Sequence, residues 1–458
     1  MKKHNTSLFI FRRDLRLYDN TALINASKNS NMVIPIFIFT KDQLINNPYK
    51  SDNCVQFMMS CLDNLDQMLK KHNSKLYYFF GDNDTIIKKI IKNNKIDAIY
   101  LNSDYTPFSI KRDENIKEIC LNNNIEFCPY EDVLLLPINH VKTKQDTTYT
   151  KFTPYFNAAK KIKINLPNTY TCKNFINKKT KIIGTFEGDK SKFYKNNPNI
   201  AFLAQDYINV LANIKNFKEY NKNRNNLNYE TTHLSAYIKF GIVSIRQVYE
   251  KFLELGKNND LIKQLFWRDF YYNIAFNYNY IFSKKGNLKK NYDNIKWPNN
   301  NTYYKKWCEG LTGYPVVDAC MRQLNASGYM HNRGRLITSS FLIKILLVDW
   351  KKGELYFANK LIDYDPSLNT GNWGWSSGSG ADAQPYFRIF NPWLQSAKYD
   401  KDATYIKKWI PELKDVPSKD IHNWYLEYDK YKNINYVKPI VDYKTQKKLA
   451  LKLYKSAY

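Results

Sequence analysis

The sequence lacks the marks of a secreted or membrane-spanning protein. Its seven cysteines are odd in number, contain no C-x-x-C pair and scatter from Cys54 to Cys320, which fits neither a disulfide framework nor a zinc site. No stretch approaches the ~18 apolar residues of a membrane helix, and the apolar run before Arg12 is too short for a secretory signal. We therefore expect a soluble intracellular protein of the cytoplasm or nucleus, without a metal site and without a membrane partner.

Acidic residues are in the minority. Lys and Arg total 70 against 42 Asp and Glu, a formal net charge of +28. Such an excess favours a polyanionic partner, nucleic acid first among them. A compositional bias toward Lys on a solvated surface explains the same numbers equally well. The length of 458 residues favours two domains, and a hydrophobic content of 43% is enough for a large core.

The N-terminal part alternates short β-rich runs with helical patterns. The runs lie at 7–11, 32–39, 76–80, 98–101 and 125–128. Apolar residues from Val55 to Leu69 recur at steps of three and four, which is typical of an amphipathic helix. The alternation predicts an α/β domain with a doubly wound parallel sheet over residues 1–132. No G-x-G-x-x-G follows the first strand, so a nucleotide phosphate site there is not supported.

Strand-like alternation nearly disappears after this domain. Residues 133–198 are polar, rich in Lys and Asn and interrupted by prolines, which predicts a long linker over the surface with short helices. From 199 to 458, helical patterns recur at 261–276, 316–324, 336–348 and 355–361. These patterns predict an all-α C-terminal domain. The chain contains no internal repeat.

The segment 363–392, DYDPSLNTGNWGWSSGSGADAQPYFRIFNP, is the most informative part of the chain. Its Gly and Pro residues fix loop geometry, so we expect an irregular segment built for a site. Trp373 and Trp375 would point apart on a helix and along one face on a strand. Together with the segment 313–350, it resembles the flavin- and DNA-binding core of the DNA photolyase/cryptochrome family. The resemblance covers nearly the whole chain, weakly in FRRDLRLYDNTAL and strongly from Tyr220 onward.

The resemblance implies that the C-terminal domain binds FAD. TTHLSAYIKFG matches the family's phosphate-side loop, where hydroxyls and the N–H groups that open a helix suit a pyrophosphate. A capped helix is the plainer interpretation of that segment. Arg335 would supply positive charge beside an anionic reduced flavin, with Asp363 as its carboxylate partner. The implied FAD contacts are Tyr220, Thr231, Thr232, His233, Leu234, Ser235, Arg335, Asp363, Tyr364, Asp365 and Asn369.

Asn369 corresponds to the family residue that faces flavin N5. An amide there both donates and accepts without introducing a charge. Plant-type cryptochromes carry Asp and insect ones carry Cys at this position, so Asn favours the repair branch. Trp373, Trp350 and Trp297 match the family's electron-transfer chain from flavin to surface, although a tryptophan is usually a core residue.

The motifs WRDF, HNRGR and NWGW resemble the family's lesion pocket. A flipped base is typically held between aromatic walls while polar groups read its edge, and Trp267 and Trp375 are the expected walls. We expect His331 to pack at a helix start rather than to act as a ligand or base. The implied catalytic residues are Gln264, Trp267, Asn332, Arg333, Asn369 and Trp375, and the implied DNA contacts are Arg224, Gln264, Trp267, Arg268, Asn332, Arg333 and Gln395.

Gln264 departs from the pattern. The class I-like cyclobutane pyrimidine dimer photolyases, the most similar subfamily, carry Glu at this position. An amide can donate to a pyrimidine O4 and accept from N3–H, but it cannot supply a proton. Photolyases for the (6-4) lesion carry Gln here, yet they need two histidines at the positions of Asn332 and Leu336. The sequence therefore favours the cyclobutane dimer as substrate.

A second, antenna chromophore is the least defined part of the resemblance. Residues 102–114 lack the Asn-Glu pair that the folate-binding subfamily places at Phe108 and Ser109, so a deazaflavin, a flavin or an empty cleft stay open. In total, the resemblance implies a monomeric deoxyribodipyrimidine photo-lyase that splits dimers in UV-damaged DNA by electron transfer from photoexcited reduced FAD. The alternatives are a cryptochrome-type blue-light photoreceptor and a (6-4) photolyase.

Overall fold

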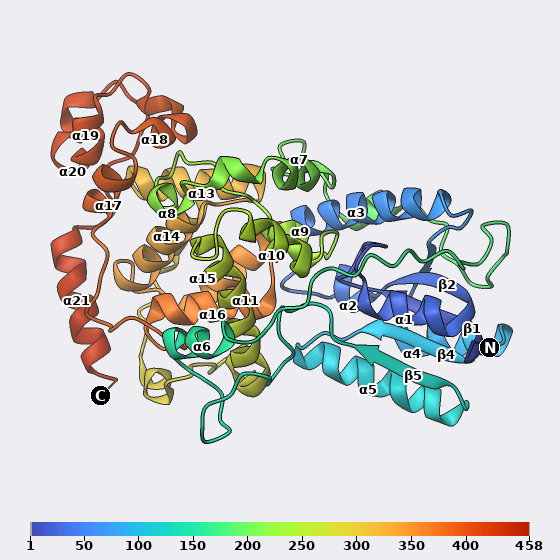
Figure 1. The fold of residues 1–458 in the computed structure, drawn as a ribbon. Coiled ribbons are helices and arrows are strands. Elements are labelled where there is room, and N and C mark those ends of the chain that lie inside the picture. The colour runs from blue at the N-terminus through green and yellow to red at the C-terminus, as the bar shows by residue number, and fades with distance from the viewer. Residues whose placement is uncertain (1, 458) are drawn as a thin grey trace.

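Five parallel strands form one sheet in the N-terminal part of the chain (Figure 1). The computed structural model describes residues 2–457. The sheet has the order β3-β2-β1-β4-β5. Its strands are β1 (His4–Phe11), β2 (Ser30–Phe39), β3 (Tyr77–Phe80), β4 (Ala98–Asn102) and β5 (Glu126–Tyr130). Each predicted strand is confirmed, with β1 at the centre between β2 and β4.

Helices cover both faces of this sheet. The alternation of side chains along β1 sends Phe9 and Phe11 into one hydrophobic cluster and Leu8 and Ile10 into another. On the first face lie α1 (Thr21–Asn29) and α3 (Asp52–Lys70), and on the second lie α4 (Asn83–Asn93) and α5 (Pro107–Asn122); α2 (Lys41–Leu44) is a short turn after β2. The predicted doubly wound α/β domain is confirmed.

The rest of the chain is helical, as predicted. The described residues of the predicted linker form two regular elements, the α-helix α6 (Phe152–Ala159) and the 3-10 helix η1 (Lys190–Phe193). The α-helices that follow are α7 (Asp206–Ala212), α8 (Tyr220–Asn223), α9 (Ser235–Lys239), α10 (Ile245–Leu253), α11 (Asp260–Asn277), α12 (Asn301–Glu309), α13 (Pro315–Ser327), α14 (Asn332–Lys344), α15 (Trp350–Lys360), α16 (Pro366–Ser377), α17 (Pro392–Tyr399), α18 (Thr404–Trp409), α19 (Ser418–His422), α20 (Trp424–Glu427) and α21 (Tyr443–Lys455). Short 3-10 segments are η2 (Ile214–Phe217), η3 (Asn279–Phe282), η4 (Lys290–Asn294), η5 (Pro411–Leu413) and η6 (Tyr428–Tyr431). Over residues 2–457, no helix is long and apolar enough to cross a membrane.

The expectation of an irregular segment over 363–392 is wrong in its first half. Residues 366–377 form the α-helix α16. The Asp365 carboxylate accepts from the backbone N–H of Leu368 at the helix start, and Pro366 occupies the first turn, where its missing N–H costs nothing. Gly378 ends the helix in the left-handed conformation. As expected for a helix, the two tryptophans diverge: Trp373 is buried and Trp375 is half-buried.

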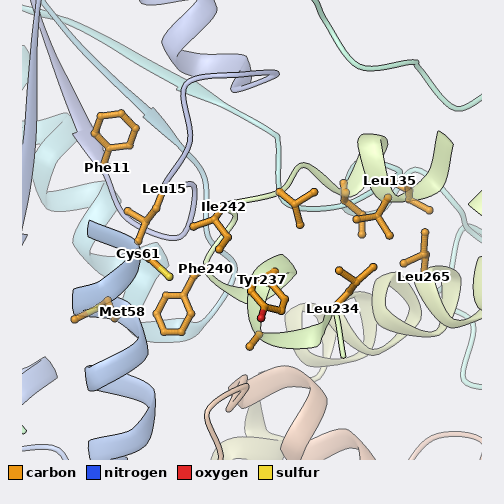
Figure 2. Close-up of a cluster of buried hydrophobic side chains, with 14 of the residues drawn as sticks. Phe11, Leu15, Met58, Cys61, Leu135, Leu234, Tyr237, Phe240, Ile242 and Leu265 are labelled. Atoms are coloured by element: carbon orange, nitrogen blue, oxygen red, sulfur yellow. The ribbon is translucent and has the colours of Figure 1, made fainter. Parts of the chain in front are cut away.

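One hydrophobic core continues across both parts of the chain (Figure 2). Phe11 of β1 and Met58 of α3 belong to the same buried cluster as Phe240, which follows α9, and Leu265 of α11. Leu135 of the linker adds to it. The sheet and the helical domain are therefore packed as one body.

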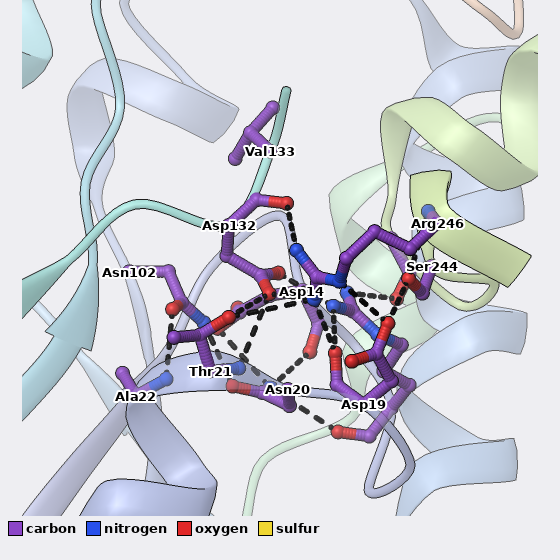
Figure 3. Close-up of polar contacts among 12 residues, drawn as sticks. Asp14, Asp19, Asn20, Thr21, Ala22, Asn102, Asp132, Val133, Ser244 and Arg246 are labelled. Carbon is purple, nitrogen blue, oxygen red and sulfur yellow. Dashed lines mark hydrogen bonds and ion pairs between the residues drawn. The ribbon is translucent and has the colours of Figure 1, made fainter. Parts of the chain in front are cut away.

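A buried polar clamp lies beside this core (Figure 3). Arg246 of α10 donates to the carboxylates of Asp19, at 2.8 Å, and Asp132, at 2.7 Å, both of which belong to the α/β domain. Arg16 holds the second oxygen of Asp132 at 2.5 Å. Burial opposes ionisation of Asp132, yet the charges of Arg16 and Arg246 outweigh burial and hold its pKa well below the ordinary value. The clamp joins the two domains through buried charges, and in either domain a buried charge without its partner would be costly.

Replacing Arg246 by Ala should destabilise the fold by about 3–5 kcal/mol, because two buried carboxylates lose a partner. The matched control is Lys251→Ala on the same helix, which breaks an exposed pair with Glu254 and should cost less than about 1 kcal/mol. Urea unfolding of both variants measures the difference.

Lowering the pH should reduce the stability that the ion pairs of Asp132 contribute. Because the folded-state pKa of Asp132 is depressed, its stabilisation is present above the unfolded-state pKa of about 3.9 and is lost as pH falls through the folded-state pKa. Equal free energies of unfolding for the Arg246 and Lys251 variants would show that the clamp contributes nothing.

Candidate FAD and DNA site

Three elements of the helical domain bring together a hydroxyl, a carboxylate and a guanidinium. Ser235 at the start of α9 donates to Asp363 at 2.7 Å, and Arg335 of α14 donates to the same carboxylate at 2.9 and 3.2 Å. Asp363 is nearly buried, whereas the guanidinium is about a quarter exposed. The predicted pairing of Arg335 with Asp363 is confirmed. The exposed part of the Arg335 guanidinium offers a positive charge beside the polar groups of Ser235 and Asp363, as an anionic ligand requires.

Asn369 lies on α16, buried, with its amide held in one orientation. Its Nδ2 donates to both the backbone carbonyl of Glu354, at 3.0 Å, and the side-chain Oε1, at 2.9 Å. Burial raises the pKa of Glu354, and Thr370 donates a further hydrogen bond to the same oxygen. Among the hydrogen bonds of residues 2–457, none uses Oδ1 of Asn369. Because both amide hydrogens are taken, Asn369 presents an acceptor to a ligand.

Asp365 joins the site to the α/β domain. Arg13, from the loop after β1, forms a short ion pair with its carboxylate, and Tyr272 of α11 donates to it at 2.5 Å. Burial opposes ionisation of Asp365, but the charge of Arg13 keeps its pKa below the ordinary value. All of these contacts are internal to the protein. The structure therefore gives Asp365 a role in holding the domains together that the sequence did not indicate.

The other predicted FAD contacts lie at the start of α8, just before α9 and just before α16. Thr231 lies 3.4 Å from the hydroxyl of Tyr329, and His233 adopts a left-handed backbone with its ring against Tyr329. Tyr364 stacks on Tyr49 of the α/β domain. Thr232 and Leu234 are buried, and Tyr220 is half-buried at the start of α8.

The three tryptophans of the predicted electron route differ in exposure. Trp373 and Trp350 are buried, and Trp297 is half-buried, which is the order that a path from interior to surface requires. Trp350 donates its indole N–H to Asn287 at 3.0 Å. A further tryptophan outside this predicted route, Trp307, is fully buried and lies edge-on to Trp373 with ring centroids 6.3 Å apart.

Gln264 and Trp267 lie half-buried on α11. The Gln264 amide makes one long contact, 3.5 Å to the carbonyl of Asp260, so it is available to a ligand. Phe152 of α6 stacks on Trp267 with ring centroids 3.6 Å apart and planes 7° apart. Phe152 of the linker therefore covers one face of Trp267, the expected aromatic wall of the lesion pocket. Phe152 was not predicted, because nothing in its sequence context pairs it with a residue so distant.

The predicted DNA contacts at the start of α14 are accessible. His331 caps that helix, accepting from the N–H of Arg333 at 3.1 Å, which confirms the packing role predicted for it. Asn332 is exposed, and Arg333 lies over the Tyr399 ring and donates to Asn225 at 2.5 Å. Arg224, paired with Asp260, and Gln395 of α17 are half-buried.

Arg268 is not placed for DNA contact, and this prediction is wrong. It is 8% exposed, stacks over Tyr272 and donates to the carbonyl of Val133 at 2.6 Å. Its position on α11 faces the start of the linker rather than solvent. A guanidinium so enclosed fastens the linker to the helical domain.

A cavity of about 580 Å³ lies between the domains. Its walls come from the carboxyl ends of β1 and β2, the start of α5, and α15 and α16 of the helical domain. Apolar side chains, among them Phe37, Met58 and Phe240, alternate with charged ones. Glu354 and Thr370 also line it, so one wall of the cavity is the shell that holds Asn369.

Two arginines share one carboxylate on this cavity. Arg12 and Arg112 both donate to Asp113, at 2.8 and 3.0 Å. Each retains a buried Nη2 that has no hydrogen-bond partner among the described residues. Burial and the charge of Arg12 lower the pKa of Arg112 to about 10, so Arg112 remains cationic at neutral pH. Two unpaired donors beside the start of α5 form a local excess of positive charge.

Comparison with known proteins agrees with this geometry. A family model described as DNA photolyase matches residues 7–171, and one described as the FAD binding domain of DNA photolyase matches residues 261–456. The deoxyribodipyrimidine photo-lyase of Buchnera aphidicola is 36% identical, covering 98% of this chain and 97% of its own. That of Escherichia coli is 32% identical, with 99% of both chains covered.

Solved structures show the same fold. The archaeal photolyase of Sulfolobus tokodaii, crystallised with two FAD molecules, is 40% identical with a TM-score of 0.88, covering 98% of this chain and all of its own. The cryptochrome of Synechocystis is 27% identical with a TM-score of 0.87, covering 99% of this chain and all of its own.

Proposed function

Because the chain belongs to the DNA photolyase family, we propose that it repairs UV-damaged DNA by splitting cyclobutane pyrimidine dimers in light. The observation that carries the choice of repair is Asn369, an uncharged amide held by Glu354 with its carbonyl oxygen free. A carboxylate there would add a charge beside the cofactor, and a thiol would lose the acceptor.

The residues present fit FAD. The free oxygen of Asn369 suits the N–H that a reduced flavin carries at N5, and the Arg335–Asp363 pair suits its negative charge. Thr231, Thr232 and Ser235 would hold the phosphate side. When bound, reduced FAD supplies the electron that light transfers to the lesion and recovers it after the ring splits. The protein's contribution is therefore positioning, exclusion of water and a fixed electrostatic environment.

The lesion would be held where α11, α14 and α16 meet. Trp267 and Trp375 present aromatic surface to a flipped dinucleotide, and Gln264 reads the pyrimidine edge. Asn332 and Arg333 would contact the base edge or the adjacent backbone, with Arg224 and Gln395 on the DNA face. A photoreceptor is the second candidate, favoured by the similarity to the Synechocystis cryptochrome.

Gln264 provides the sharpest test of the substrate. Gln264→Ala should cost about 1–3 kcal/mol in lesion binding, because the polar edge of the dimer loses its partner. Gln264→Glu should retain repair or raise its quantum yield, because a carboxyl can steady the dimer radical anion. Repair yields of pre-reduced wild type and both variants, on cyclobutane and (6-4) oligonucleotides, measure this. Identical dimer yields and affinities in all three would reduce Gln264 to a packing residue.

Trp350→Phe should sharply slow flavin photoreduction with an external donor and leave repair by pre-reduced enzyme nearly intact, since phenylalanine is not readily oxidised. Trp307→Phe is the matched control: it also removes a buried indole, and one that contacts Trp373, but lies outside the proposed route. Transient absorption at matched flavin content follows both variants. Normal photoreduction in the Trp350 variant with slow photoreduction in the Trp307 variant would reassign the route.

We further propose that the interdomain cavity holds a second chromophore, a planar molecule with an anionic group at Arg12 and Arg112. The apolar walls suit an aromatic ring, and the two unpaired Nη2 atoms suit a phosphate or an ionised ring oxygen. The second FAD of the Sulfolobus tokodaii photolyase supports a flavin nucleotide.

Arg112→Gln should weaken binding of flavin mononucleotide at this site by about 10–100-fold, the effect of one charge-assisted hydrogen bond. Riboflavin, which has no phosphate, should bind wild type as weakly as the nucleotide binds the variant. Arg322→Gln, whose partner Glu412 lies outside the cavity, is the control. Fluorescence titration of protein already saturated with FAD measures these affinities. Equal affinities of wild type for riboflavin and the nucleotide would show that no contact with the phosphate contributes to binding.

A further inference from the structure

Three metal-binding residue types meet at the edge of the sheet where the strands begin. His4 is the first residue of β1, Glu126 is the first residue of β5, and Cys128 follows two residues later in β5. Their ligand atoms all lie within 4.8 Å of one another. His4 is 6% exposed and Cys128 is 8% exposed, whereas the Glu126 side chain is 41% exposed. The group thus combines a buried nitrogen, a buried sulfur and one carboxylate exposed at the surface.

The imidazole of His4 points a bare nitrogen into this group. Its Nε2 is buried and has no hydrogen-bond partner within residues 2–457, although Glu126 Oε2 lies 3.4 Å away. The edge-on contact with Tyr100, at 6.0 Å between ring centroids, holds the ring against the sheet. A simple His–Glu contact would leave that nitrogen poorly paired, and a buried polar atom without a partner is costly.

We propose that His4, Glu126 and Cys128 bind a borderline-soft divalent cation, Zn²⁺ being the best match. Imidazole, thiolate and carboxylate are the three side chains that bind zinc, through bonds of about 2.0–2.3 Å. A tetrahedral ion with such bonds holds its ligand atoms about 3.3–3.8 Å apart. Because His4 Nε2 and Glu126 Oε2 already lie 3.4 Å apart, the remaining distances have to contract by about 1.5 Å at most. Water would complete the fourth position.

Binding exchanges one proton for one metal ion. The Cys128 thiol gives up its hydrogen as the sulfur–zinc bond forms, and neither partner is oxidised or reduced. Lys3 opposes binding, because its Nζ contacts the same Glu126 oxygen at 2.6 Å and must be displaced. Both residues of this ion pair are exposed, so displacement costs little.

The ion would link β1 to β5 across β4. His4 lies about 20 Å along β1 from Ile10, the first residue of β1 that lines the cavity between the domains, counting six steps of about 3.3 Å. The site is therefore independent of the proposed repair chemistry and of the second chromophore. Its expected effect is on the stability of the α/β domain.

The test uses the full-length flavoprotein stripped with a chelator. Zn²⁺ is titrated in competition with a chromophoric chelator, and proton release is followed in weak buffer. We expect one zinc and about one proton per chain. Loss of a residue that only supports a metal ligand typically weakens metal binding by about 10–100-fold. His4→Gln and Cys128→Ser each remove a direct ligand, so each should weaken zinc binding by at least that factor. Zinc should raise the melting temperature of wild type but not of these two variants.

Two further variants guard against misfolding. Cys120→Ser removes a buried cysteine outside the group and should bind zinc as wild type does. Lys3→Ala changes an exposed residue and should strengthen binding, because it removes the competing cation. Zinc binding that is equal in wild type, Cys128→Ser and Lys3→Ala, or a preference for Mg²⁺ or Ca²⁺ over Zn²⁺, would overturn the proposal.

Discussion

Buried ion pairs between the two domains are the constraint on which the rest of the molecule depends. Arg246 of α10 pairs with Asp19 and Asp132, and Arg13, from the loop after β1, pairs with Asp365 at the start of α16. A charge in this interior has no favourable alternative to its partner. The hydrophobic cluster shared by α3, α9 and α11 adds non-directional attraction, while the ion pairs fix the register of one domain on the other.

That register sets the geometry of the site. Asp365 both caps α16 and accepts the Arg13 pair, so the helix that carries Asn369, Trp373 and Trp375 is anchored to the α/β domain. Glu354 then holds the Asn369 amide from one side and lines the interdomain cavity on the other. The proposed flavin site and the proposed chromophore cavity consequently share a wall. The proposed electron-transfer reaction has little need of acid–base groups and depends instead on fixed orientation, which these contacts provide.

Much of this could be predicted from local patterns. The strands were predictable because apolar residues such as Leu8, Phe9 and Ile10 run without interruption in sheets covered on both faces. The start and end of α16 were also present in the sequence, as Asp365, Pro366 and Gly378, but the number of glycines favoured a loop interpretation.

What escaped prediction depends on tertiary contacts. The burial of Arg268 comes from its contact with the distant Val133, and the covering of Trp267 comes from Phe152 on the linker. The grouping of His4 with Glu126 and Cys128 arises from parallel strands far apart in sequence, which no spacing motif describes. Roles that the family resemblance assigns, such as that of Gln264 toward the lesion, stay predictions until they are measured.

The most direct test of the central claim is a blue-light repair assay with the purified, reduced protein on oligonucleotides that each carry one defined lesion. The account predicts light-dependent splitting of the cyclobutane dimer and no repair of the (6-4) product, since Asn332 and Leu336 replace the two histidines that (6-4) repair needs. Repair of the (6-4) product alone, or flavin photochemistry without repair of either lesion, would contradict it.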